Sequence, residues 1–569
     1  MFSLHESLDE PTRAALAEYD DLTAALLARR GMLCAEDAAA FLSPSYDEHL
    51  SDPLKITDME KAARRLAKAI TEHERIAVWS DYDCDGIPGG VLLHDFLRKA
   101  CADFENYIPH RHLEGYGVNV AGIEKLAASG ARLVVTVDSG IVDNEAVARA
   151  NELGLEIIVT DHHLPGATLP DAYAVVNPNA RENETSSFRS FCGAALAWQL
   201  VRATLSVDPS LRERVPAGWE KWLLDMVGFA TIADMVPLVG ENRVIASYGL
   251  VVLRKSPRIG LQKLCAVARV NQRTLMEDDV GFMLAPRVNA ASRMGDPMDA
   301  FRLLTTDNED EADLLAKKLE KANRERRASA GAITREVHGR LKDRGDLPPV
   351  IAMGNPEWRP ALLGLVANGI AETYDRPVFL WGREANLSLK GSCRSDGSVH
   401  VVELMTAARE TFVQFGGHAF SGGFTVRDEA IFSFESRLVE AHAVTPVRED
   451  AGDRMRADAA LSPSEATLDL LSRIEKLAPF GEGNPKPVFL VRDAGITKVL
   501  WFGKGEDHLK ISLARDDSPL EAVSFYAKRE LGNAVADLAE GARVTFLANI
   551  ERDQFSRGRP VRLRIISLS

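Results

Sequence analysis

Three aspartates stand at alternate positions directly after the apolar run Ile76–Trp79: Asp81, Asp83 and Asp85, followed by Gly86. In an extended segment, residues two apart project to the same side, so we expect the three carboxylates to converge. Carboxylates held together repel one another unless a cation lies between them, and a hard divalent ion with oxygen ligands fits that need. Taken alone, the stretch is equally compatible with a solvated turn, because short acidic motifs often carry no metal.

Two further apolar runs, Leu133–Val137 and Glu156–Thr160, also end at polar groups. The first run is followed by Asp138 and the second by Asp161-His162-His163. Helical patterns alternate with these runs, which predicts a parallel sheet whose ligands gather at the carboxyl ends of its strands. Asp234 follows a helix-like run and is a fourth candidate, although a helix-terminal aspartate without a ligand role is the alternative for it alone.

Together these positions form a mixed set of carboxylate and imidazole groups. Such a set suits Mn²⁺ or Mg²⁺ better than Zn²⁺, whose structural sites favour thiolate and imidazole ligands. With this many carboxylates, two ions bridged by one of them is the natural arrangement, and two ions suit a displacement at phosphorus. The set consists of Asp81, Asp83, Asp85, Asp138, Asp161, His162, His163 and Asp234.

Composition limits the class of protein. A chain of 569 residues exceeds what one core supports, so we expect three or four domains. The N-terminus lacks a signal-peptide pattern and no long apolar run occurs, which predicts a cytoplasmic protein without membrane contact. The six cysteines are scattered, as in a reducing compartment. The net charge of −15 argues against a surface coated in basic residues but leaves room for a local basic channel.

The motifs DYDCDG (81–86), TVDSG (136–140) and DHH (161–163) resemble the DHH phosphoesterase superfamily. Further motifs resemble its RecJ family, the bacterial exonucleases that degrade single-stranded DNA from 5′ to 3′. They are YIPHRHLEGYG (107–117), AVVNPN (174–179), ATIADMVPLVGENR (230–243), PRVNAASR (286–293), KGSCRS (390–395) and FGGHAFSGG (415–423). The resemblance covers nearly the whole chain in order.

This resemblance implies a role for each candidate. Asp85, Asp138, His162 and Asp234 would bind one ion, and Asp83 with Asp138 and Asp81 would bind the second. Asp161 would orient the neighbouring histidines, and His163 would face the scissile phosphate. The substrate-binding candidates are Arg111, Arg287, Asn289, Arg293, Ser392, Arg394 and His418.

The implied architecture is an α/β chain of five parts. A helical segment (1–50) precedes a doubly wound parallel-sheet DHH catalytic domain (51–305), and a long connecting helix (306–345) follows. An α/β DHH-associated domain (346–445) and a C-terminal oligonucleotide-binding β-barrel (460–569) complete it. Basic and aromatic residues of the barrel suit backbone tracking and base stacking. They are Lys504, His508, Lys510, Phe525, Tyr526, Arg557, Arg559, Arg562 and Arg564.

The function expected from the resemblance is 5′→3′ degradation of single-stranded DNA to 5′-mononucleotides in DNA repair and recombination. Expected partners are single-stranded DNA, a single-strand-binding protein and a helicase, and we expect a monomer. Two alternatives remain open: a DHH phosphodiesterase for short oligonucleotides or cyclic dinucleotides, and a non-enzymatic scaffold like the inactive relatives found in replication complexes.

Overall fold

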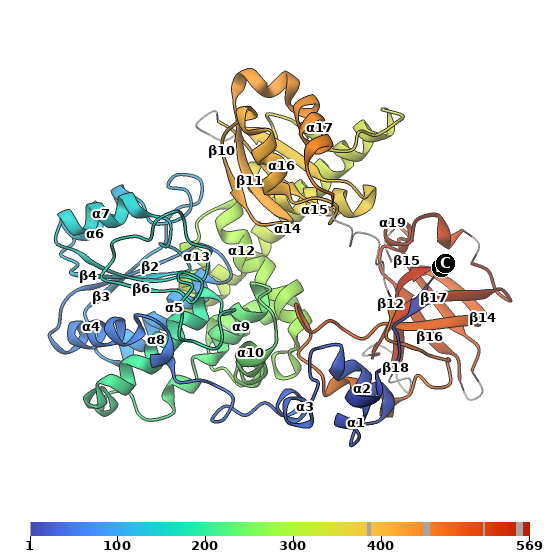
Figure 1. The fold of residues 1–569 in the computed structure, drawn as a ribbon, viewed down its shortest axis with the longest axis horizontal. Coiled ribbons are helices and arrows are strands. Elements are labelled where there is room, and N and C mark those ends of the chain that lie inside the picture. Colours follow the sequence, from blue (N-terminus) through green and yellow to red (C-terminus); the bar gives the residue numbers. More distant parts are fainter. Residues whose placement is uncertain are drawn as a thin grey trace.

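The computed structural model describes residues 2–383, 388–447, 456–503, 505–515, 518–536, 538–553 and 561–568. Three sheet-containing units surround the middle of the molecule in Figure 1: a parallel sheet on the left, a mixed sheet at the top and a barrel on the right. None of the helices in the described ranges is long and apolar enough to span a membrane.

The first unit is built on a five-stranded parallel sheet in the order β3-β2-β4-β5-β6. Every residue of β2 and β4 is buried, as continuous apolar runs predict for a sheet covered on both faces. The strands are β2 (Ile76–Ser80), β3 (Phe104–Tyr107), β4 (Leu133–Val137), β5 (Glu156–Thr160) and β6 (Ala174–Val176).

Helices cover both faces of this sheet. Ile76 and Val78 point into one core, while Ala77 and Trp79 point into the other, because successive strand residues alternate between faces. The first core takes in α4 (Met59–Thr71), α5 (Gly86–Lys99) and α8 (Gly193–Val207), and the second takes in α6 (Val120–Ala128) and α7 (Asn144–Glu152). The doubly wound fold that the sequence predicts is therefore confirmed.

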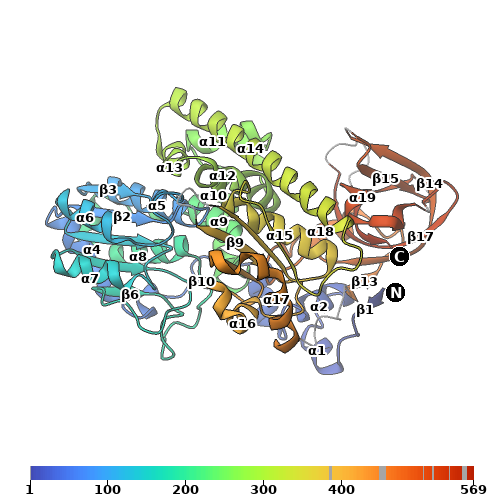
Figure 2. The ribbon, with the colours of Figure 1, turned by 90° about the horizontal axis from the view of Figure 1, so that it is seen from above.

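A helical layer extends this unit and leads into one long helix. It contains α9 (Leu224–Ala233), α10 (Gly240–Leu253), α11 (Ile259–Ala268), a π-helical turn (Asp279–Leu284), α12 (Ala285–Met294) and α13 (Met298–Thr305). The 34-residue α14 (Glu309–Lys342) follows and runs as one continuous rod in Figure 2. Leu315 and Leu319 pack into the first unit, whereas Val337 and Leu341 pack into the second, so α14 joins the two cores.

The second unit is a mixed sheet in the order β10-β11-β9-β8-β7. Its strands are β7 (Ile351–Gly354), β8 (Val378–Arg383), β9 (Leu389–Arg394), β10 (Phe412–Gly417) and β11 (Ser421–Val426). Its helices are α15 (Pro360–Tyr374), α16 (Val401–Ala407) and α17 (Phe434–Val444).

The C-terminal unit is a closed barrel, because β14 pairs with β15 on one side and with β17 on the other. Its strands are β14 (Phe489–Phe502), β15 (His508–Leu513), β16 (Leu520–Ser524), β17 (Arg543–Arg552) and β18 (Val561–Leu568). His508 packs against Phe525 and Tyr526, and the guanidinium of Arg564 lies 5.4 Å from the ring centre of Phe525. Lys504, Arg557 and Arg559 lie outside the described residues.

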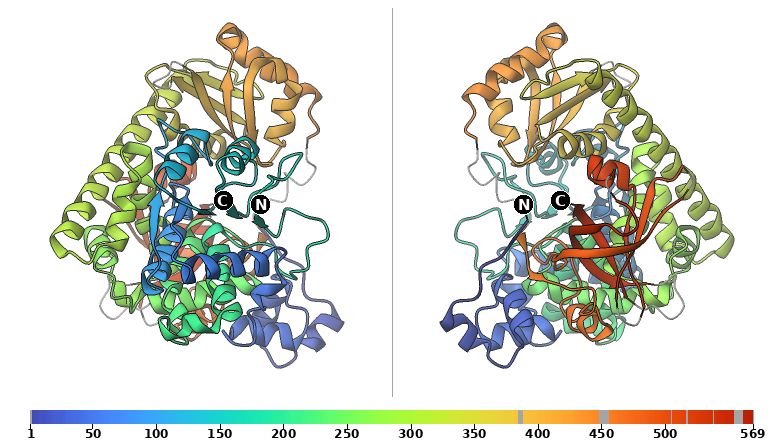
Figure 3. Two further views of the ribbon diagram at one scale, coloured as in Figure 1. Left: turned by 90° about the vertical axis from the view of Figure 1, so that its left-hand side faces the viewer. Right: turned by 90° about the vertical axis from the view of Figure 1, so that its right-hand side faces the viewer.

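The first 45 residues pack against the C-terminal unit. The short strand β1 (Ser3–Leu4) pairs in parallel with β12 (Arg456–Ala457), and Leu477 lies in the core of α2 (Asp21–Ala28) and α3 (Ala35–Leu42). The two ends of the chain accordingly lie close together in Figure 3. The guanidinium of Arg243 on α10 donates to the carbonyl oxygens of Phe41 and Leu477 at 2.5 and 2.8 Å, which ties this assembly to the first unit.

Candidate metal centre

The candidate ligands lie at the carboxyl ends of β2, β4 and β5. The chain runs from β2 outward to β3 and then crosses back to β4 on the other side of β2. The loops at such a reversal diverge and leave a crevice, where open parallel sheets place their ligands. The DYDCDG, TVDSG and DHH motifs all begin at this crevice.

The segment from Asp81 to Asp85 is a turn, which differs from the extended geometry that the sequence suggested. The Oδ1 atom of Asp83 accepts the backbone N–H groups of Asp85 and Gly86 at 2.8 and 3.1 Å, which closes the turn. A Cβ atom on Gly86 would lie 2.5 Å from the carbonyl oxygen of Asp81, so the turn requires glycine there. The turn separates the three carboxylates into two groups.

Asp81 and Asp83 have carboxylate oxygens within 4.8 Å of one another and of a carboxylate oxygen of Asp138. Asp85 belongs instead to a group with His162 and Asp234. The Nε2 atom of His162 lies 3.2 Å from Asp138 Oδ1 and 3.7 Å from one carboxylate oxygen of each of Asp85 and Asp234. Asp138 therefore stands between the two groups.

The electrostatics of this cluster favour a bound cation. Burial, followed by repulsion from neighbouring carboxylates, raises the pKa of Asp81, Asp138 and Asp234 well above the ordinary range. The buried Oδ1 atoms of Asp81 and Asp138 accept no hydrogen bond within the part of the chain that the structure describes. Burial lowers the pKa of His162, which keeps the neutral imidazole that binds metals. The residues present therefore fit Mn²⁺ or Mg²⁺.

Asp85 is anchored by the start of α8. Its two carboxylate oxygens accept the backbone N–H groups of Gly193 and Ala194 at 2.5 and 2.8 Å, where the positive end of a helix favours an anion. A Cβ atom on Gly193 would lie 2.5 Å from the Cβ atom of Asp138. The glycine thus permits α8 to approach both carboxylates.

The second histidine of the DHH motif is held by the aspartate. His163 Nδ1 lies 2.8 Å from Asp161 Oδ1. Burial alone would lower the pKa of His163, but the hydrogen bond and the charge of Asp161 raise it. Asp161 also accepts the N–H of Ile141 at 3.0 Å, so its carboxylate fixes both the loop and the imidazole.

Three residues that our sequence analysis did not assign support this loop. Asn177 and Asn179 donate to the carbonyl oxygens of His163 and His162 at 2.8 and 2.7 Å, which explains the AVVNPN motif. The hydroxyl of Tyr116 lies 3.3 Å from His163 Nδ1 and donates to the carbonyl oxygen of Asp138. In the sequence these three residues stand out only as members of the YIPHRHLEGYG and AVVNPN motifs, because their contacts depend on the geometry of the loops.

Two of the substrate-binding candidates, Arg111 and Arg293, lie beside the metal centre. The guanidinium of Arg111 stacks 4.8 Å from the ring centre of Tyr82. Burial, with repulsion from Arg111 and Arg326, lowers the pKa of Arg293 to about 10. Arg293 also donates to the carbonyl oxygen of Ala361 on α15 at 2.6 Å and so reaches the second unit. Positive charge is therefore concentrated where the two units meet.

Ser392 and Arg394 project from one side of β9, and Gly364 of α15 makes room for them. A Cβ atom on Gly364 would lie 3.0 Å from a terminal nitrogen of Arg394 and 3.6 Å from Ser392 Oγ. Gly364 is one helical turn from Ala361, the residue that Arg293 contacts. His418 is exposed in the turn between β10 and β11.

The remaining two candidates, Arg287 and Asn289, make contacts within the first unit and with α14. Arg287 is 7% exposed and pairs with Glu320 of α14 at 2.7 Å. Asn289 accepts the N–H of Cys84 at 2.9 Å and thereby supports the DYDCDG turn from α12. Both side chains hold elements together, because α12 packs between the turn and α14.

Family models match the chain in three places. The DHH family N-terminal domain matches residues 75–231, the DHHA1 domain matches 348–441 and the RecJ OB domain matches 457–567. The doubly wound fold and its cluster of carboxylate and imidazole groups define a metal-dependent hydrolase of the DHH superfamily.

Relatives specify the family within that superfamily. The chain is 33% identical to the single-stranded-DNA-specific exonuclease RecJ of Bacillus subtilis over 96% of this chain and 67% of the relative. It is 32% identical to RecJ of Escherichia coli over 80% of this chain and 81% of the relative. The crystal structure of Thermus thermophilus RecJ in complex with Mn²⁺ superposes with a TM-score of 0.81 and 28% identity, covering 99% of this chain and 78% of that chain. The chain belongs to the RecJ family.

Proposed function

We propose that this protein is a 5′→3′ exonuclease that degrades single-stranded DNA to 5′-mononucleotides with two divalent ions. The observation that carries the proposal is the position of Asp138 between two groups of ligands. Asp85, Asp138, His162 and Asp234 would hold one ion, and Asp81, Asp83 and Asp138 would hold the other. When bound, two such ions supply a hydroxide nucleophile and neutralise the leaving oxygen.

The chain's own residues supply the remaining steps of the proposal. His163, held by Asp161, would donate a hydrogen bond to the scissile phosphate and stabilise its developing charge. Arg111 and Arg293 from the first unit, with Ser392 and Arg394 from the second, would bind the 5′-phosphate at the interface of the two units.

The barrel favours a long strand over a short substrate. Its cluster of His508, Phe525, Tyr526 and Arg564 combines aromatic faces with a cation, the combination that binds single strands without sequence preference. A phosphodiesterase for cyclic or very short nucleotides has no need for such a platform. A role in DNA repair and recombination, with a single-strand-binding protein and a helicase as partners, completes the proposal.

The test is digestion of a 30-nucleotide strand labelled separately at each end, with Mn²⁺ or with EDTA, beside a dinucleotide. We expect early release of the 5′ label as a mononucleotide only when Mn²⁺ is present. Early release of the 3′ label would reverse the direction, and cleavage confined to the dinucleotide would favour the alternative. Absence of cleavage, with strand binding unchanged in Asp138→Ala, would favour a scaffold.

A further inference from the structure

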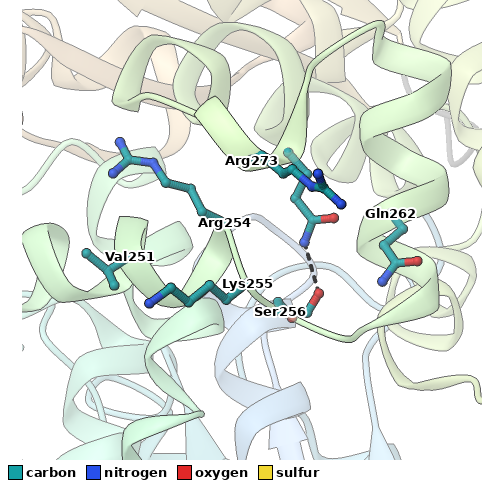
Figure 4. A pocket seen from close by; sticks show the side chains of 7 residues that line it. Val251, Arg254, Lys255, Ser256, Gln262 and Arg273 are labelled. Atoms are coloured by element: carbon teal, nitrogen blue, oxygen red, sulfur yellow. Dashed lines mark hydrogen bonds between the residues drawn. The ribbon is translucent and has the colours of Figure 1, made fainter.

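A basic cavity lies at the end of α10, away from the candidate metal centre. Its volume is about 950 Å³, and it is lined by Val251, Arg254, Lys255, Ser256, Gln262, Gln272 and Arg273. Figure 4 shows Arg254 and Lys255 along one side of the cavity and Arg273 and Gln262 on the other. Three cations and no carboxylate contribute to its lining.

These three cations differ from their neighbours, which are paired with carboxylates. Arg258 pairs with Asp95 and Asp225, and Lys263 pairs with Glu309. Within the described residues, no carboxylate pairs with Arg254, Lys255 or Arg273. In a chain with 83 acidic and 68 basic residues, three adjacent cations without such partners indicate an anionic ligand.

The lining is also oriented for hydrogen bonding. Arg254 Nε donates to the carbonyl oxygen of Leu275 at 2.8 Å, which fixes the guanidinium and leaves its two terminal nitrogens for a ligand. Gln272 is fixed by hydrogen bonds to the carbonyl oxygens of Leu253 and Ser256, both at 2.9 Å. Gln262 of α11 (Ile259–Ala268) adds a side-chain amide to the lining.

We propose that this cavity is a second binding site for phosphate groups, separate from the metal centre. Two terminal guanidinium nitrogens match two phosphate oxygens, and the volume accommodates a nucleotide. An adjoining hollow shares Arg254 and Arg273 and extends to Arg552 of β17, which is paired with Glu475 in the same lining. Because this hollow leads toward the barrel, the phosphates of a bound strand are the other source of a phosphate ligand.

The cavity is connected to the metal centre through α9. Ser256, which lines the cavity, donates to Asp225 Oδ2 at 2.7 Å. Asp225 lies in the first turn of α9, and the ligand candidate Asp234 ends the same helix nine residues later, roughly 14 Å away along its axis. A ligand in the cavity would therefore lie against Ser256, which contacts the start of α9, and Asp234 lies at the other end of the same helix.

The experiment uses the full chain in EDTA, so that its outcome does not depend on the proposed catalytic activity. Calorimetry measures binding of deoxythymidine monophosphate, and fluorescence anisotropy measures binding of a 20-nucleotide thymidine strand. The test variant is Lys255→Gln/Arg273→Gln, because both residues are exposed. Lys263→Gln, which removes a neighbouring charge already paired with Glu309, is the matched control.

We expect the double variant to raise the Kd for one ligand about tenfold and the control to change it less than twofold. Weakened binding of the monophosphate alone assigns the site to free nucleotides, and weakened binding of the strand assigns it to backbone phosphates. Unchanged binding of both ligands, equal weakening in the control, or no binding of either ligand by the unmodified protein overturns the proposal. Equal melting temperatures verify that the variants are folded.

Discussion

Asp138 combines an unusual backbone with an exceptional charge environment. Its φ of 60° lies in the left-handed region, which Asn and Asp tolerate better than other residues with side chains. Asp138→Asn should therefore keep the fold while removing one repelling charge. We expect the metal-free variant to melt a few degrees above the unmodified protein, since about 1 kcal/mol corresponds to roughly 2–4 °C in a large domain. Exonuclease activity should fall at least about 100-fold.

Thermal melting without Mn²⁺ measures the expected rise in the melting temperature of Asp138→Asn. Melting with Mn²⁺ then reports metal binding, because a bound ligand stabilises the folded state. Mn²⁺ should raise the melting temperature of the unmodified protein more than that of Asp138→Asn. An equal rise in both proteins would show that Asp138 does not bind the ion.

Asp143, which is not one of the candidate metal ligands, predicts that the free energy of unfolding depends on pH. Burial raises its pKa to about 6 from the ordinary value near 3.8, while the N–H of Val118 donates to its carboxylate at 2.7 Å. A raised folded-state pKa gives stability that is full below pH 3.8 and is lost as pH rises through 6. Its magnitude is on the order of 3 kcal/mol. Asp143→Asn keeps an acceptor for Val118 and should lack this loss.

Urea unfolding of both proteins between pH 4 and 8 isolates the effect, because other titrating groups cancel in the difference. The free energy of unfolding of Asp143→Asn, relative to the unmodified protein, should increase across pH 4–6 and then level off. If the difference in free energy of unfolding between the two proteins stayed constant with pH, the pKa of Asp143 would not be raised in the folded state.

At the scale of elements, the start of α8 determines how closely two candidate ligands, Asp85 and Asp138, approach each other. Gly193→Ala places a Cβ atom 2.5 Å from that of Asp138, so α8 must move and Asp85 must lose its backbone donors. We expect a loss of roughly 1–3 kcal/mol in stability and of 10–100-fold in Mn²⁺ affinity, measured by calorimetry.

Gly339→Ala is the control for this prediction. Gly339 lies in α14, and a Cβ atom added there would have nothing within 4 Å, so alanine should stabilise the helix slightly and leave Mn²⁺ affinity unchanged. Equal Mn²⁺ affinities in the two glycine variants would exclude α8 as the element that positions the site.

The elements were the most predictable feature of this chain. Continuous apolar runs at 76–80, 133–137 and 156–160 specify buried parallel strands, and the polar residues after them specify the site. The turn at 81–86 was not predictable, because its shape comes from the side chain of Asp83 accepting two backbone N–H groups. The contacts of Arg287 and Asn289 depend on the packing of α12 against distant elements, which residue spacing does not encode.

At the scale of the whole molecule, Arg243 holds three parts of the chain together. It is 2% exposed, lies over the ring of Phe41 and donates to carbonyl oxygens of residues 41, 477 and 478. Arg243→Met would remove the Arg243 donor from all three acceptors, of which Leu477 keeps a second donor, Asn484. We expect a cost of roughly 2–5 kcal/mol. We expect the C-terminal unit to unfold at a lower temperature than the first unit in differential scanning calorimetry.

We expect cleavage activity to depend on which of the two units is still folded. Because the candidate metal centre lies in the first unit, Arg243→Met should retain any dinucleotide cleavage that the unmodified protein shows and lose activity on a long strand above the lower transition. A single transition at the unmodified temperature would show that Arg243 does not couple the units.

The pairing of β1 with β12 also affects how the protein is made. Ser3 and Leu4 find their partners at Arg456 and Ala457, about 450 residues later in the chain. At roughly 5–20 residues per second, a ribosome needs on the order of 20–90 seconds to supply that partner strand. The segment that contains Ser3 and Leu4 is therefore among the last to reach its final place, although it is made long before its partner, and its apolar helix faces remain uncovered until the C-terminal unit has been synthesised.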